Sequence, residues 1–345
     1  SDLGIPLVAV GFIYNQGYFA QHITEDGWQE TRNLILNFDE MPILPVEDAQ
    51  GKPVIISVEL PGRSVFARIW QVRVGRVMLY LLDTNLAENN NGDRQLTARL
   101  YSNDLEVRIS QEILLGMGGV RALRQLGYSP DVWHMNEGHS AFLALERALE
   151  LVRAGKTFDQ AASIIKKTNI FTTHTPVPAG NDQFPIWLVD KYFTQVWPEL
   201  QLTRDQFVEL GHQVQPWGES FCMPVLALKL SDYRNAVSEL HGQVSRRMWN
   251  WMWPNIRAEE VPITHVTNGV HTGTFLARRL RLLFDRYLGA DWMKNIDDPE
   301  MWAQIENIPD GELWQVRRHL KRKLVVFANT RTRALWQSGS ITPAQ

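Results

Sequence analysis

The feature that most restricts the fold of this chain is an alternation of strand and helix patterns in its middle third. Asp131 to Met135 and Asn169 to Thr173 are short apolar segments typical of buried strands. Between them, His139 to Ala154 and Phe158 to Lys167 carry helical apolar spacing, and Gly155 closes the first helix. Strands that alternate with helices pair in parallel through right-handed crossovers. The sequence therefore predicts an α/β fold with a Rossmann-like parallel sheet.

The segments on either side of this alternation extend the prediction. Residues 1–103 form a β-rich part, with strand patterns at Ile5 to Tyr14, Pro53 to Leu60 and Ser64 to Asp83. Residues 104–345 form an α/β and helical part that opens with a helix from Asp104 towards Gly127. A third strand is expected in this second part, at Ile263 to Val266. Helical spacing is found at Leu188 to Trp197, Tyr233 to Trp253, Gly273 to Leu288 and Glu312 to Leu335.

Composition narrows the classes of function. The chain has 345 residues, 35 Lys and Arg against 38 Asp and Glu, and a formal net charge of -3, so neither a nucleic acid nor an anionic membrane is expected as partner. The single Cys222 excludes an internal disulfide framework and a multi-cysteine zinc site. No apolar run approaches the roughly 20 residues of a membrane span. We therefore expect a cytoplasmic protein.

Polar clusters follow the three predicted strands. Because ligands of open parallel sheets bind at the carboxyl ends of the strands, these clusters are the candidate site. Their amide, imidazole, carboxylate and hydroxyl groups suit a polyhydroxylated ligand, so a sugar is favoured over phosphate. No glycine-rich phosphate loop is present, and the glycines between 116 and 119 sit in a helical pattern that favours close helix packing. The clusters are residues 134–139, 174–182 and 268–272.

Several side chains in these clusters admit a structural role as well as a functional one. His134 alternates into the predicted sheet and is interpreted as a structural histidine, whereas for His139 and His174 both roles stay open. A metal site formed by His134, Glu137 and His139 lacks a His-Glu-x-x-His spacing, so no metal is expected. Asp104 and Glu137 form a candidate carboxylate pair for glycoside hydrolysis.

Two further segments have competing interpretations. Trp249, Trp251 and Trp253 could present an aromatic face to a glucan or a partner subunit, although tryptophan is more often a core residue. The basic stretch from Arg317 to Lys323 has apolar residues on its opposite face, which favours a solvated amphipathic helix.

A set of ordered motifs resembles the bacterial short-type α-glucan (glycogen, starch or maltodextrin) phosphorylases. The likeness covers nearly the whole chain, and several motifs in family order make it more specific than one motif could. The motifs are Leu3-Gly4-Ile5-Pro6-Leu7-Val8, Tyr14-Asn15-Gln16-Gly17-Tyr18-Phe19, Glu25-Asp26-Gly27-Trp28-Gln29, Gln111-Glu112-Ile113-Leu114-Leu115-Gly116, Asn136 to His139, Phe171 to Gly180 and Thr267-Asn268-Gly269-Val270-His271.

The resemblance implies a retaining transfer of the non-reducing-end glucosyl unit of an α-1,4-glucan to inorganic phosphate, giving α-glucose 1-phosphate. Family members use pyridoxal 5′-phosphate, whose phosphate group relays a proton. By resemblance, His174 contacts the 6-hydroxyl of the transferred glucosyl unit with Thr175 beside it. Glu137 corresponds to a nearby acidic residue. His139 lines the same pocket, with Asn136 in the same motif, and Asp104 follows Asn103 in a loop at the catalytic pocket.

The resemblance also has limits along the chain. The family's glycine-rich loop precedes the segment that matches Ser1, and its cofactor lysine follows the segment that matches Gln345. Lys166, Lys167 and Lys323 do not resemble the cofactor-lysine motif. We therefore expect residues 1–345 to be an incomplete N-terminal domain of a glycosyltransferase-B-type fold, inactive alone. The resemblance leaves homo-oligomer formation open, and a hydrolase or a non-catalytic glucan-binding module stays the alternative.

Overall fold

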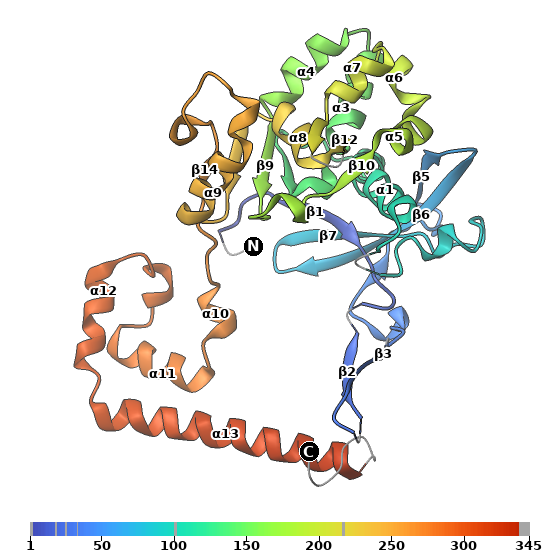
Figure 1. The fold of residues 1–345 in the computed structure, drawn as a ribbon. Coiled ribbons are helices and arrows are strands. Elements are labelled where there is room, and N and C mark those ends of the chain that lie inside the picture. The colour runs from blue at the N-terminus through green and yellow to red at the C-terminus, as the bar shows by residue number, and fades with distance from the viewer. Residues whose placement is uncertain are drawn as a thin grey trace. The chain divides into compact units, whose positions relative to one another are not determined.

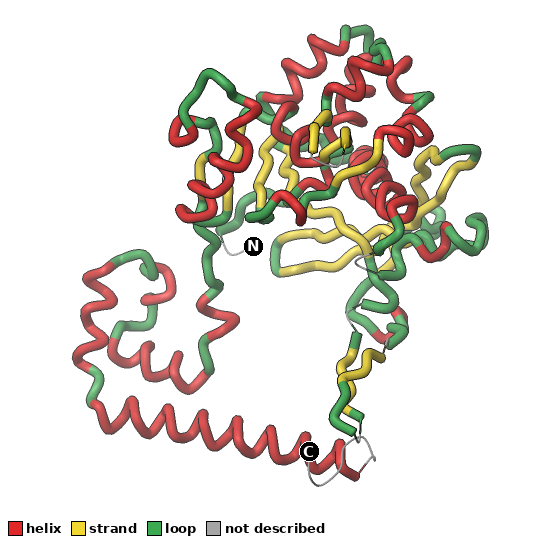
Figure 2. Tube along the Cα trace, in the orientation of Figure 1, coloured by secondary structure: helices red, strands yellow, loops and turns green. Residues whose placement is uncertain are grey.

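A computed structural model describes residues 3–17, 19–24, 26–32, 34–99, 102–215 and 218–337 (Figures 1 and 2). The chain divides into two compact units. The first consists of residues 1–19 and 33–267, and the second of residues 20–32 and 268–345. Tyr18 and Glu25, which belong to two of the motifs quoted above, lie outside the described residues, as do Ser1 and Asp2.

The β-rich part predicted for residues 1–103 is present in the first unit as a five-stranded sheet. β6 is its longest strand and pairs antiparallel with β4, β5 and β7, whereas β1 pairs parallel with β7. Along β5 the buried residues alternate with more exposed ones, as expected for a sheet with one face on the core. The strands are β1 Val8–Phe12, β4 Leu44–Pro45, β5 Ile55–Leu60, β6 Arg63–Val74 and β7 Val77–Asp83.

The helix predicted after Asp104 is interrupted by a wider turn. It consists of α1 (Leu105–Ile113), the π-helical η3 (Leu114–Gly118) and α2 (Gly119–Gln125). The glycines of this segment permit close packing, as predicted. A Cβ on Gly116 would lie 2.7 Å from the backbone nitrogen of Leu143, and one on Gly118 would lie 3.2 Å from a methyl group of Val58. η3 is therefore packed tightly between the first sheet and α3.

The predicted parallel sheet is confirmed. Its four strands are ordered β14-β13-β9-β8, and each neighbouring pair is parallel. One prediction is wrong, because residues 233–236 form a strand and the helix begins only at Glu239. Pairing with strands on both sides overrides the helical spacing there. The elements are β8 Trp133–Asn136, β9 Asn169–Thr173, β13 Tyr233–Ala236, β14 Thr264–His265 and α9 Glu239–Trp249.

Helices connect and cover these strands. α4 begins at a capping box in which Thr157 and Gln160 satisfy each other's backbone groups. α4 and α8 contact β9, α9 contacts β13 and β14, and α3 packs on α4. A small antiparallel sheet, which the sequence did not suggest, completes the unit. These elements are α3 Leu143–Arg153, α4 Phe158–Lys166, α5 Ile186–Phe193, α6 Val196–Glu199, α7 Arg204–Glu209, α8 Met223–Lys229, β10 Gln183–Pro185, β11 His212–Gln215 and β12 Gly218–Cys222.

The second unit is mainly helical, with one hairpin. Its own small core gathers around the buried Trp292, whose ring lies 5.4 Å from that of Phe284 and 5.8 Å from that of Trp302. α13 is the long helix that ends the described chain (Figure 1). No helix in the described ranges combines the length and apolar character needed to cross a membrane. The elements are β2 Ala20–Ile23, β3 Gln29–Arg32, α10 Thr272–Phe275, α11 Arg278–Tyr287, α12 Pro299–Ala303 and α13 Asp310–Gln337.

Candidate functional site

Two of the three predicted polar clusters meet at one edge of the parallel sheet. β8 and β9 are neighbours, and Asn136 at the end of β8 pairs in register with Thr172 of β9. The residues that follow each strand, Glu137 and His174, are therefore brought close together. The third cluster follows β14 and belongs from Asn268 onward to the second unit, where His271 Nδ1 lies 2.6 Å from Thr274 Oγ1.

Glu137 joins the two strand ends. Its Oε2 accepts hydrogen bonds from the backbone N–H of His174 (2.7 Å), the backbone N–H of Thr175 (2.9 Å) and the Thr175 hydroxyl (3.0 Å). Its Oε1 accepts one from the backbone N–H of Gly138 at 3.1 Å. The residue is buried and has a φ of 75°, a strained conformation for a side chain other than glycine. The carboxylate thus fixes the backbone that carries His174 and Thr175.

His174 and Asn136 present polar groups beside this buried carboxylate. Nε2 of His174 lies 2.6 Å from Oδ1 of Asn136, and both side chains are exposed. This pair offers hydrogen-bond donors and acceptors at the strand ends. Glu137 holds the backbone of His174 through a hydrogen bond to its N–H. An imidazole and an amide in this position can each hydrogen-bond a hydroxyl of a sugar.

A cavity of about 440 Å³ adjoins the strand ends. Three predicted site residues line it, namely Glu137, His139 and Thr175, together with Asn103. The glycine of the Asn136-to-His139 motif is needed here, since a Cβ on Gly138 would lie 2.8 Å from Cδ of Pro224. The remaining lining residues are Ser102, Leu105, Arg108, Gly138, Gly180, Asn181, Asp182 and Pro224.

A cluster of half-buried charged side chains, with the buried Glu112 behind it, forms one wall of this cavity. Arg108 on α1 donates to both oxygens of Asp182, at 3.2 Å from Nε to Oδ1 and 2.8 Å from Nη2 to Oδ2. Its Nε also lies 3.0 Å from Oε1 of Glu112, one helical turn further along α1. Oδ2 of Asp182 lies 3.3 Å from Nδ1 of His139. Arg108 therefore contacts the carboxyl groups of both Asp182 and Glu112.

This arrangement shifts the pKa values of the two acids in opposite directions. Burial raises the pKa of Glu112 well above its usual range, and the negative charge of Asp182 adds to that rise. Burial alone would also raise the pKa of Asp182, but the hydrogen bonds from His139 and Arg108 lower it. The surroundings therefore favour the protonated form of Glu112 and the anionic form of Asp182, which pairs with Arg108.

Sequence reasoning assigned no role to Arg108, Glu112 or Asp182. The i,i+4 spacing of Arg108 and Glu112 was a usable signal for an ion pair on one helix face. Asp182 was part of the second polar cluster, but its partner is 74 residues away along the chain. Only the fold could reveal that contact.

Asp104 has a structural role in the described chain. It is the N-cap of α1, and its Oδ1 accepts hydrogen bonds from the backbone N–H groups of Glu106 (2.8 Å) and Val107 (3.4 Å). It is exposed and is not among the residues that line the cavity. Its predicted place at the catalytic pocket stays a prediction.

His134 lies on the exposed face of β8, not against the core, and its Nε2 is 2.7 Å from the hydroxyl oxygen of Thr172. Partial desolvation of the ring, followed by the nearby His174, lowers the pKa of His134. The thiol of Cys222 is buried, and burial raises its pKa to about 12, so it is no nucleophile at neutral pH.

The tryptophans near residue 250 do not share one exposed face. Trp249 is 1% exposed and belongs to the core, whereas Trp251 is 47% exposed. Trp253 is half-buried, with the guanidinium of Arg234 lying 5.5 Å from its ring centroid. This arrangement offers one ring, not three, to a ligand or a partner.

Comparison with known proteins gives this site its context. The chain is 44% identical to the maltodextrin phosphorylase of Thermococcus litoralis over 94% of its length, which is 38% of that protein. It is 41% identical to the glycogen phosphorylase of Mycobacterium tuberculosis and 36% identical to that of Aquifex aeolicus, in both cases over the whole chain. The chain is a relative of the α-glucan phosphorylases.

The resemblance expected from the motifs is thereby confirmed. The chain spans less than half the length of these phosphorylases, 38%, 41% and 49% respectively. No protein-family model matches the chain.

Proposed function

We propose that this chain contributes to an α-glucan phosphorylase, which transfers the non-reducing-end glucosyl unit of an α-1,4-glucan to inorganic phosphate with retention of configuration. The observation that carries the proposal is the identity of 36–44%, over 94% or more of the chain, to proteins named maltodextrin or glycogen phosphorylase. A cytoplasmic location and a glycosyltransferase-B-type arrangement of the parallel sheet belong to the same proposal.

The strand-end residues would hold the transferred sugar. His174, Asn136 and Thr175 are the polar side chains at the ends of β8 and β9, and each offers a hydrogen bond to a hydroxyl. A buried sugar hydroxyl without a partner costs roughly 1–3 kcal/mol, so several such groups are needed around one glucosyl unit. Glu137 acts as a positioning residue, because its carboxylate holds the backbone of His174 and Thr175.

Pyridoxal 5′-phosphate is the cofactor that the family relationship suggests, and in these enzymes it supplies proton transfer through its phosphate group. Its attachment requires a lysine amine. The residues that line the cavity include no lysine among those described, and Arg108, the cation in that lining, is already bound to Asp182. These residues do not fit the cofactor by themselves, so no catalytic step is assigned to it.

A glycoside hydrolase using Asp104 and Glu137 is the second candidate. Hydrolysis needs one carboxyl group free to protonate the leaving oxygen and another free to attack or activate water. Here Asp104 caps a helix and Glu137 accepts hydrogen bonds from three backbone amides. Both carboxylates are engaged in holding the backbone, which favours the phosphorylase.

The experiment that separates the two reactions follows product release from maltodextrin by the full-length protein supplied with pyridoxal phosphate. We expect glucose 1-phosphate to form only when inorganic phosphate is present. New reducing ends in phosphate-free buffer would support the hydrolase instead. Glucan binding without either product would support the non-catalytic module.

A further inference from the structure

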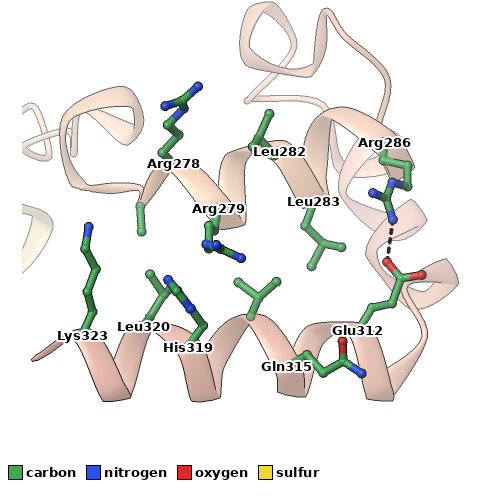
Figure 3. Close-up of a pocket in the computed structure, with 12 residues that line it drawn as sticks. Arg278, Arg279, Leu282, Leu283, Arg286, Glu312, Gln315, His319, Leu320 and Lys323 are labelled. Atoms are coloured by element: carbon green, nitrogen blue, oxygen red, sulfur yellow. Dashed lines mark hydrogen bonds and ion pairs between the residues drawn. The ribbon is translucent and has the colours of Figure 1, made fainter. Parts of the chain in front are cut away.

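The second unit contains a gap between two helices whose facing side chains carry the same sign of charge. The gap between α11 and α13 has a volume of about 1060 Å³. Figure 3 shows Arg279 on α11 pointing towards His319 on α13, with Lys323 further along the same edge of α13. Leu283 and Leu320 supply an apolar floor between the helices.

Glu312, the single acidic residue in the lining of this gap, is already bound to other side chains. At one end of the gap, Oε2 of Glu312 lies 2.8 Å from Nη1 of Arg286, and its Oε1 accepts from the Tyr287 hydroxyl at 3.0 Å. Within the described chain, no ion pair is found for Arg278, Arg279 or Lys323, the other strong cations that line the gap. The strongly charged side chains that line the end away from Glu312 are therefore all cations.

The sequence of α13 adds positive charge around the gap, and Lys323 is the one of its lysines and arginines that lines the gap. After Glu312 the helix has no Asp or Glu. Its cations from there on are Arg317, Arg318, Lys321, Arg322, Lys323, Arg331 and Arg333. Like charges held close together on facing surfaces repel one another, and this repulsion is relieved when an anion enters between them.

We propose that the gap between α11 and α13 binds a small ligand that carries phosphate groups. A phosphate group brings close to two negative charges near pH 7 into a small volume, and an arginine guanidinium matches its oxygens with paired donors. A volume of about 1060 Å³ lies just above the usual range of roughly 300–1,000 Å³ for small-molecule sites, so the gap has room for such a ligand. The leucines of the floor would contact an apolar part of the ligand. The site uses residues of the second unit only and does not depend on phosphorylase activity.

His319 provides an internal reporter for this site. Desolvation and the positive charges of Arg279, Arg322 and Lys323 lower the pKa of its imidazole. The other charged groups that line the gap are Arg278, whose guanidinium points away from α13 in Figure 3, and the Glu312–Arg286 pair at the far end. An anion between Arg279 and Lys323 would offset the positive field and raise the pKa of His319.

The test uses the full-length protein with inorganic tripolyphosphate as the probe. Binding is followed by calorimetry, and the titration of His319 by NMR with and without the probe. We expect saturable binding, a raised pKa of His319 on binding, and affinity that falls by about tenfold in the double variant Arg279→Gln/Lys323→Gln. The matched control is Arg331→Gln/Arg333→Gln, which removes two positive charges from α13 at positions that do not line the gap. It should bind within about twofold of wild type.

Three outcomes would overturn the site. Equal weakening in both double variants would show diffuse attraction to a basic helix. An unchanged pKa of His319 at saturation would place the probe elsewhere. Sedimentation of the protein with phosphatidylglycerol vesicles, together with no binding of tripolyphosphate, would assign the cations to a membrane surface.

Discussion

The two units of this protein use arginine in opposite ways. In the first unit, Arg108 is half-buried between two carboxyl groups, and Arg121 is bound to the buried Glu146 at 2.8 Å. In the second unit, Arg279 and Lys323 face each other's helices with no carboxylate between them. These two arginines of the first unit are therefore neutralised by carboxylates, whereas the gap in the second unit keeps a positive charge.

This contrast predicts that charges in the first unit matter mainly for the free energy of unfolding, and charges in the gap of the second unit mainly for ligand binding. A buried charge that loses its partner is costly, because it has no access to water. An exposed charge is solvated whether or not it is paired, so its removal changes folding little and changes ligand attraction more. Matched substitutions in the two units should therefore have very different effects on unfolding.

Arg108→Gln should have the largest effect. It leaves Asp182 without its cation. Breaking a fully buried pair typically costs about 3–5 kcal/mol, and because Asp182 is partly exposed we expect a loss near the lower end of that range. Hydrogen exchange of first-unit amides, measured at increasing urea concentration, gives this loss in the free energy of unfolding. A cost below about 1 kcal/mol would mean that the cluster is open to water and would remove the contrast.

Gly116→Ala should rank second. Its new methyl group would lie 2.7 Å from the backbone nitrogen of Leu143, and such overpacking costs about 1–3 kcal/mol. Gly311→Ala in the second unit is the matched control, because nothing lies within 4 Å of its Cβ position. That change should be neutral or stabilise α13 by up to about 1 kcal/mol. Similar losses in both variants would contradict the tighter packing of the first unit.

Glu112→Gln should change how stability depends on pH. The unfolded chain releases this proton near pH 4.3, whereas the folded chain keeps it to a higher pH, because the pKa of Glu112 is raised. Stability should therefore fall as pH rises through that interval, by about 1.4 kcal/mol per pH unit from this group. The glutamine variant should lose this slope in urea midpoints measured from pH 5 to 7. Equal slopes in the two proteins would show that Glu112 is ionised when folded.

Arg286→Gln should have the smallest effect. Its partner Glu312 is reached across an exposed gap, and exposed pairs contribute about 0.2–1 kcal/mol. Hydrogen exchange in α13 should change by no more than that amount. A loss as large as that of Arg108→Gln would mean that the two units do not differ in how they treat charge.

The sequence predicted the parts of this fold that depend on local pattern. The parallel pairing of β8 with β9, the helix closed by Gly155 and the close packing of Gly116 are all confirmed. Residues 233–236 were predicted as helix but form a strand. Their conformation is decided by pairing with β9 and β14, which the local sequence pattern does not describe.

The candidate site was predictable only in part, for a physical reason. The residue types at the strand ends pointed to Glu137 and His174, but the acceptor role of Glu137 depends on backbone amides 37 and 38 positions away. The contact between Arg108 and Asp182 spans 74 positions. Such distances along the chain are closed by packing, which no local pattern describes.

The central claim, that the ends of β8 and β9 hold the transferred glucosyl unit, is tested most directly by comparing two histidines of the same sheet. We expect His174→Ala to lower kcat/KM for phosphorolysis of maltodextrin by about 10–100-fold, equivalent to roughly 1.4–2.8 kcal/mol of transition-state stabilisation. His134→Ala, which removes one of the two side-chain partners of the Thr172 hydroxyl, should stay within about twofold of wild type. A wild-type rate in His174→Ala, or equal losses in both variants, would contradict the account.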